Sequence, residues 1–219
     1  MKFLELINLT LQELNYKTVS AFTDLVKPDH KKIISCVSLA NNRILNLRDW
    51  DFLRREGVLA IPMHADCVDL PWEMKLKSVN IDGRNLDYIE DCTRFLLGEV
   101  VENAYSTFEG QLLLTPAPFK RVAKVFYITK NHAKNAAGAE VPRLVYGDDE
   151  TLLPDEFASS ALVYCACAQF KSNPQHPKYR HWVESFAAEQ AKMVAANEST
   201  AYAAPEIKLP RWTFGADRY

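Results

Sequence analysis

Apolar residues near the start of the chain recur at helical spacing. Leu4, Ile7, Leu11 and Leu14 are separated by three, four and three residues, which places them on one side of an α-helix. The intervening positions are mostly polar. The pattern therefore predicts an amphipathic helix over about residues 2–15.

A second and longer apolar stripe follows Pro28. It consists of Ile33, Val37, Ala40, Ile44 and Leu47. Proline is tolerated in the first turn of a helix, and Asp29 beside it favours the positive end of the helix dipole. The stripe predicts a helix over about residues 28–49. Trp50 and Phe52 follow it and can anchor the helix end in a core.

The pattern changes after Gly57 to short apolar segments bounded by proline and glycine, which is typical of strands. We expect strands over about residues 58–61, 67–70, 76–81, 111–115 and 122–129. Asp82-Gly83 is a hairpin dipeptide because both residue types tolerate positive φ. These segments predict a β-rich insertion over about residues 58–130. Residues 84–110 receive no assignment, because 86–97 fits a helix and strands equally well.

The remainder of the chain is polar and then helical again. Residues 130–150 are small and polar, which favours a long exposed loop. Helices are predicted over about residues 155–171 and 178–196, and the prolines at 174 and 177 separate them. Residues 199–219 show neither a helical nor a strand period, and the two prolines among them favour extended backbone.

Together these elements predict an α+β fold that is mainly a bundle of four helices, with an inserted β-rich protrusion and an extended C-terminal tail. Hydrophobic residues make up 48% of the 219 residues and charged residues 25%, which are values typical of a globular protein. We expect a single domain over residues 1–198, followed by the tail at 199–219.

Charge and cysteine usage exclude several classes of protein. The formal net charge is −2, whereas a general nucleic-acid binder is usually basic. The five cysteines are an odd number with no C-x-x-C pair, so they indicate buried thiols in a reducing compartment and neither a disulfide framework nor a zinc ribbon. The N-terminus lacks a signal-peptide pattern, and the longest apolar stretch, 161–168, is too short to span a bilayer. We expect a soluble, intracellular protein that does not bind membranes.

Catalytic motifs are missing from the chain. It contains no phosphate-binding glycine loop, nucleophile elbow or zinc-protease motif. His64 and Cys67 lack a third supporting group, and Asp66 and Asp69 are spaced for opposite faces of a strand. We therefore expect no catalytic residues, no cofactor and no metal site, and we predict that the protein is not an enzyme.

The tail is the most informative segment for function. Aromatic and arginine side chains dominate protein interfaces, and the tail concentrates both. Its candidate partner-binding residues are Lys208, Arg211, Trp212, Phe214, Arg218 and Tyr219. The tail either docks on a partner or neighbouring subunit, which we favour, or packs back on its own domain.

Several packing and turn motifs resemble those of a known family. They are Asn41–Leu45 followed by Trp50–Leu53, the Val58–Pro62 strand, Asp69-Leu70-Pro71, Ile81-Asp82-Gly83, Leu153–Phe157 leading into Ala161–Cys167, then Asn173-Pro174, and the helix with Tyr179, Trp182 and Phe186. Over most of its length the chain resembles the head-to-tail adaptor (connector, or head completion) proteins of tailed bacteriophages, particularly the podovirus-like group related to tail tubular protein A.

The resemblance implies a structural role in the neck of a virion, after synthesis in the host cytoplasm. Such adaptors form homo-oligomeric rings, usually of twelve copies, beneath the portal protein and above tail or nozzle proteins. DNA passes through their channel without sequence-specific binding, and their terminal segments commonly embrace the portal. The alternatives are another neck or tail-completion protein, a phage assembly chaperone, or a small enzyme without a recognisable motif.

Overall fold

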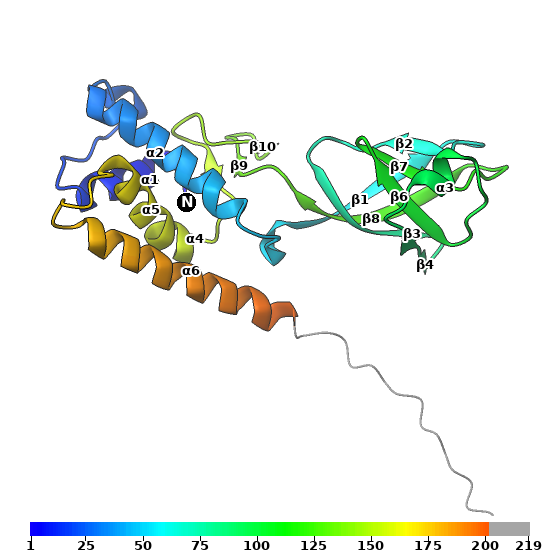
Figure 1. The fold of residues 1–219 in the computed structure, drawn as a ribbon. Helices are drawn as coiled ribbons and strands as arrows, with labels where there is room; N and C mark the ends of the chain where they lie inside the picture. The colour runs from blue at the N-terminus through cyan, green and yellow to red at the C-terminus, as the bar shows by residue number, and fades with distance from the viewer. Residues whose placement is uncertain (202–219) are drawn as a thin grey trace, which may run out of the picture.

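A computed structural model describes residues 1–201, with side chains to residue 198, as two lobes joined by a pair of strands (Figure 1). Residues 1–53 and 130–201 form the helical lobe, and residues 54–129 form the β lobe. None of the helices in the described part of the chain combines the length and hydropathy needed to cross a membrane.

The helical lobe is assembled around one central helix. This helix starts as α4 (Asp155–Phe157), passes through a π-helical turn at Ala158–Leu162, and continues as α5 (Val163–Phe170). α1 (Phe3–Glu13), α2 (Pro28–Leu45) and α6 (Tyr179–Ala201) pack around α5. Two short 3₁₀ turns, Phe22–Asp24 and Asp51–Leu53, flank α2.

Two tryptophans fix the ends of these helices. Trp50, after α2, is buried, stacks on Phe52 at 5.7 Å and donates its indole N–H to the Ile44 carbonyl. The predicted anchoring of this helix end is therefore confirmed. Trp182 on α6 is also buried and donates to Glu13 Oε1 on α1 at 2.9 Å, which holds α6 against α1.

A small three-stranded antiparallel sheet completes the helical lobe. It has the order β10 (Glu140–Val141), β9 (Ala133–Lys134), β11 (Glu150–Thr151). The prediction of a long exposed loop over 130–150 is wrong, because this segment contributes buried side chains to the lobe. Those residues are Asn131, His132, Ala133, Leu144 and Asp149.

The β lobe is a sandwich of two four-stranded sheets. Sheet 1 has the order β1 (Arg54–Ile61), β8 (Arg121–Thr129), β3 (Met74–Ile81), β4 (Arg84–Asn85), with antiparallel neighbours. Sheet 2 has the order β2 (Cys67–Asp69), β7 (Gln111–Leu114), β6 (Ala104–Phe108), β5 (Asp87–Tyr88), in which β5 is parallel to β6. The short helix α3 (Thr93–Leu96) lies between β5 and β6 in the sequence.

Alternate residues of the two sheets meet in a shared core. Its buried members are Leu59, Ile61, Val79, Ile81, Tyr105, Leu112, Leu114, Ala123 and Val125. The predicted hairpin is confirmed: Asp82 and Gly83 have φ of 53° and 79° and join β3 to β4.

The prediction of a mainly helical four-helix bundle is wrong. The residues described form eleven strands in three sheets, and the β lobe is a separate sandwich with its own core. Sequence patterns underestimated the strands because β4, β5 and β6 fall in the unassigned region 84–110. The helices differ in detail: α2 ends at Leu45, short of residue 49, and α6 continues to Ala201, past the expected helix end at 196.

Candidate interaction surface

The predicted partner-binding residues cannot be placed. Lys208, Arg211, Trp212, Phe214, Arg218 and Tyr219 all lie outside the described residues.

The groups that carry chemistry are dispersed within the part of the chain that the structure describes. Residues 1–198 contain no group of three or more His, Cys, Asp or Glu side chains arranged to hold a metal ion. All five cysteines are free. Burial raises the pKa of Cys165 to about 11 and that of Cys167 to about 12, so these thiols stay protonated and unreactive at neutral pH.

The residues weighed for catalysis near β2 are engaged separately. Cys67 hydrogen-bonds with the Asp66 carboxylate, which raises the pKa of the thiol and makes it a poorer nucleophile. Asp69 instead accepts a hydrogen bond from Gln111 Nε2 at 2.8 Å. His64 is exposed in the preceding turn, with φ of 61°.

Asp149 has a structural role that sequence analysis missed. It lies in the segment 130–150 that we predicted to be an exposed loop, but Asp149 is buried and its Oδ2 accepts the backbone N–H groups of Val145 and Tyr146, both at 2.7 Å. A buried carboxylate that accepts two N–H groups organises a tight turn. Asp149 stands between two exposed acidic residues, Asp148 and Glu150, so the sequence gives no sign that its side chain is buried.

The outer face of sheet 1 is the most unusual surface of the β lobe. Val58 on β1 is 66% exposed, and Val122 and Phe126 on β8 are 59% and 41% exposed. The register places Val58 opposite Lys124, between Val122 and Phe126 on β8, so these apolar side chains form one patch. We call this patch, together with exposed Ala60, the bare face.

The outer face of sheet 2, in contrast, is covered by another part of the chain. There Ala104 of β6 and Leu113 of β7 are buried beneath Phe95 of α3 and Val101. The α3 segment, residues 87–102, thus covers the second sheet with a small core of its own. Within one sandwich, the chain covers one outer face, and none of residues 1–198 covers the other.

Apolar side chains on both faces of a strand are typical of sheets that are buried on both sides. Val58–Ile61 is apolar at four successive positions, and β8 carries Val122 and Phe126 outward while Ala123 and Val125 enter the core. A sheet that faces water on one side normally alternates apolar with polar residues. The bare face therefore has the composition of a surface that a partner covers.

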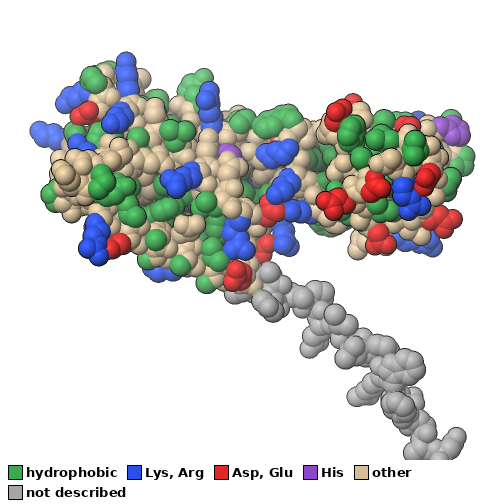
Figure 2. All heavy atoms as spheres, in the orientation of Figure 1, with side chains coloured by type: hydrophobic (Ala, Val, Ile, Leu, Met, Phe, Trp, Pro, Cys, Tyr) green, Lys and Arg blue, Asp and Glu red, His purple; other side chains and the backbone are tan. Residues whose placement is uncertain are grey.

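The charges around the bare face are mostly cationic. Four exposed cations, Arg54, Lys75, Lys77 and Lys124, lie on β1, β3 and β8. Lys124 binds Glu56 on the neighbouring strand at 2.7 Å. Lys75 and Lys77 both bind Asp49 of the helical lobe. Burial acts to raise the pKa of Asp49, but the bonds to the two lysines outweigh it and hold that pKa below its usual value. Figure 2 shows Lys and Arg side chains gathered where the two lobes meet and acidic side chains on the β lobe.

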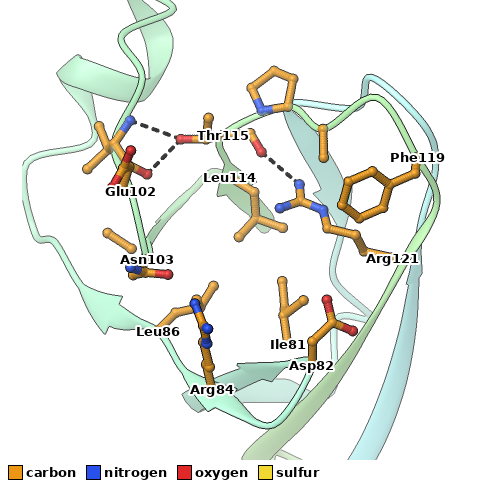
Figure 3. Close-up of a pocket in the computed structure, with 14 residues that line it drawn as sticks. Ile81, Asp82, Arg84, Leu86, Glu102, Asn103, Leu114, Thr115, Phe119 and Arg121 are labelled. Carbon is orange, nitrogen blue, oxygen red and sulfur yellow. Dashed lines mark hydrogen bonds between the residues drawn. The ribbon is translucent and has the colours of Figure 1, made fainter.

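A cavity of about 570 Å³ opens at the seam of the two sheets, beside the β3–β4 hairpin (Figure 3). Apolar side chains line its interior, and Arg121 Nη2 donates to the Thr115 carbonyl at 2.7 Å. Arg84 and Arg121 lie on opposite walls, and Asp82 and Glu102 also reach the rim. Because these polar groups do not converge on one point, we assign the cavity no small-molecule ligand.

Comparisons with known proteins leave the assignment to the structure and the sequence: no protein-family model and no curated protein matches this chain.

Proposed function

We propose that this protein is a structural component of a tailed-bacteriophage virion, where it forms a ring between the portal and the tail. The observation that carries the proposal is the bare face. Exposed apolar patches rimmed by polar residues mark protein interaction sites, and this one lies on a lobe that projects away from the helical lobe (Figure 1). The sequence resemblance to head-to-tail adaptors supplies the kind of partner.

The charge of the chain supports a passage for DNA better than a binding site for it. A protein that binds phosphates needs clustered lysine and arginine to replace counterions. Here the net charge is −2, and the exposed cations on β1, β3 and β8 are already bound to carboxylates. A channel lining must let DNA move, so weak attraction for phosphate suits that role.

The direct test is to mix the full chain with its cognate portal and image the product by electron microscopy. An additional ring on the portal is the expected result, and a portal that stays bare contradicts the proposal. Mass spectrometry of purified virions separates an adaptor from an assembly chaperone, since a chaperone leaves before the particle is complete.

The tail hypothesis has its own test. Removing residues 202–219 leaves every described element in place, so the truncated protein is expected to fold with an unchanged melting temperature. It is expected to bind the portal more weakly, because Trp212, Phe214 and the neighbouring arginines are lost. Equal binding by the full and truncated chains means that the tail does not dock on the portal.

A further inference from the structure

We propose that the bare face of one copy of this chain binds the α3 segment of the next copy, so that the β lobes assemble head to tail. The inference rests on the proposed function for the idea of a ring, and it assigns the two surfaces that meet. Three features of the β lobe carry it: the apolar character of both surfaces, their opposite charges and their positions on the sandwich.

The α3 segment carries its own exposed apolar side chains. Leu96, Leu97 and Val100 are 56%, 73% and 74% exposed, while Phe95 and Val101, which flank them in the sequence, pack into the small core against sheet 2. The segment therefore covers sheet 2 with one side and offers a second apolar side to solvent. These three side chains match the bare face in kind and in number of large residues.

The two surfaces have opposite charge. Residues 87–102 contain five carboxylates and one arginine, a net charge of −4, and that arginine, Arg94, binds Glu99 within the segment at 2.9 Å. Glu90 and Glu102 are exposed and have no ion-pair partner among the described residues. Around the bare face, four cations meet three carboxylates, Asp49, Asp51 and Glu56, which leaves a net charge of +1.

Charge also argues against a symmetric contact between two bare faces. A two-fold dimer would bring Lys124 and its neighbouring cations towards the same cations of the second copy, and like charges at an interface are costly. The same reasoning disfavours contact between two α3 segments, where the repulsion between net charges of −4 is stronger. Contact between unlike surfaces avoids both penalties.

The positions of the two surfaces suit a ring. Sheets 1 and 2 pack through their inner faces, so the bare face and the α3 segment lie on opposite sides of the β lobe. A contact between two different surfaces repeats from copy to copy and closes when the rotation per copy divides a full turn. The sandwich thus presents one surface to the preceding copy and the other to the following copy.

Photo-crosslinking of the full chain tests the contact. Val122→p-benzoylphenylalanine places the reactive group in the bare face at an exposed position. An equal mixture of ¹⁴N- and ¹⁵N-labelled protein, illuminated at low salt and high concentration, is expected to give mixed-isotope products joined to residues 87–102. Products joined to any other segment, or the absence of mixed-isotope products, overturn the inference.

Charge reversal provides the control for specificity. In the same photo-reactive chain, Lys124→Glu is expected to lower the crosslink yield by about fivefold or more, because the new carboxylate would face the acidic α3 segment of the next copy. Adding Glu90→Lys and Glu102→Lys to that variant is expected to restore the yield. Lys31→Glu, which makes the same change on exposed α2, is the matched control and should have no effect. A yield that Lys124→Glu leaves unchanged, or that the added lysines fail to restore, contradicts the inference.

These results are independent of the portal experiment. Crosslinks to a different segment in a protein that still adds a ring to the portal refute this contact and leave the proposed function standing. The expected crosslinks in a protein that is missing from virions refute the proposed function and leave the contact standing.

Discussion

Replacing Asn41 by alanine should be among the most destabilising single substitutions in the helical lobe. Asn41 is fully buried on α2, and its amide bonds with β11 and with the residue that precedes β9 in the small sheet. Its Nδ2 donates to the His132 carbonyl at 3.0 Å, and its Oδ1 accepts from Thr151 Oγ1 at 2.5 Å. One side chain therefore holds the segments that precede β9 and end β11 against the helix.

The structure sets the size of the effect. Asn41→Ala leaves the His132 carbonyl and the Thr151 hydroxyl without that partner at buried positions. The Thr151 hydroxyl loses its acceptor, which costs about 1–3 kcal/mol. The His132 carbonyl still accepts the Leu152 N–H at 3.3 Å, so it loses one of two hydrogen bonds, at about 0.5–1.5 kcal/mol. The two together predict a loss of about 1.5–4.5 kcal/mol. That is a large fraction of the ~5–15 kcal/mol by which typical domains are stable.

Urea unfolding, followed by far-ultraviolet circular dichroism and tryptophan fluorescence, measures this loss. Ser35→Ala on the exposed side of α2 is the control, because Ser35 bonds only within its own helix; its effect should stay within about 0.5 kcal/mol. If Asn41→Ala unfolds during expression, Thr151→Val removes one hydroxyl at constant shape and serves instead. A loss below about 1 kcal/mol in Asn41→Ala refutes the reasoning, as does strict additivity with Thr151→Val.

Three other predictions follow from buried positions. Burial lowers the pKa of His132, so as pH falls below about 6.5 the unfolded chain binds a proton that the folded chain does not. The free energy of unfolding should therefore fall between pH 7.5 and 5.5. The fall should be smaller in His132→Gln. A Cβ at Gly147 would lie 2.8 Å from Phe22 Cβ, so Gly147→Ala should cost about 1–3 kcal/mol in the same unfolding assay, and an unchanged midpoint would show that the loop yields freely. A thiol reagent at pH 8 should modify the partly exposed Cys67 and Cys92 in the folded protein and the other three cysteines only after denaturant is added, and modification of all five before denaturation would contradict the described packing.

The helices were predictable because each buries one face. The stripe from Ile33 to Ile44 needs only local spacing to be recognised, and Ile33, Val37, Ala40 and Ile44 are indeed buried. The end of α2 was not predictable from that stripe: Leu47 continues the spacing but is 43% exposed, beyond the last helical turn. The predicted proportion of helix to strand was wrong because two-residue strands such as β4 and β5 are too short to show a period of two.

The small sheet of the helical lobe depends on contacts that no local pattern records. Asn41 and Thr151 are 110 residues apart in the chain, and Asn42 and Asn46 reach the two ring nitrogens of His132 across a similar separation. The segment 130–150, which holds these strands, is rich in small polar residues and has the composition of a loop. Only the three-dimensional path of α2 turns that run into paired strands.

The bare face differs from both cases, because its signal was present in the local sequence. Val58–Ile61 and the run from Val122 to Ile128 contain large apolar residues at positions of both parities, whereas a strand with one solvated face alternates. Such runs were enough to predict strands. Because apolar residues occupy both faces of these strands, the runs also indicate that the outer face of the sheet is covered. In sheet 2 that cover is the α3 segment. In sheet 1 no described segment of the same chain supplies it, so the apolar side chains that remain exposed on β1 and β8 fit the contact with a second copy that we propose.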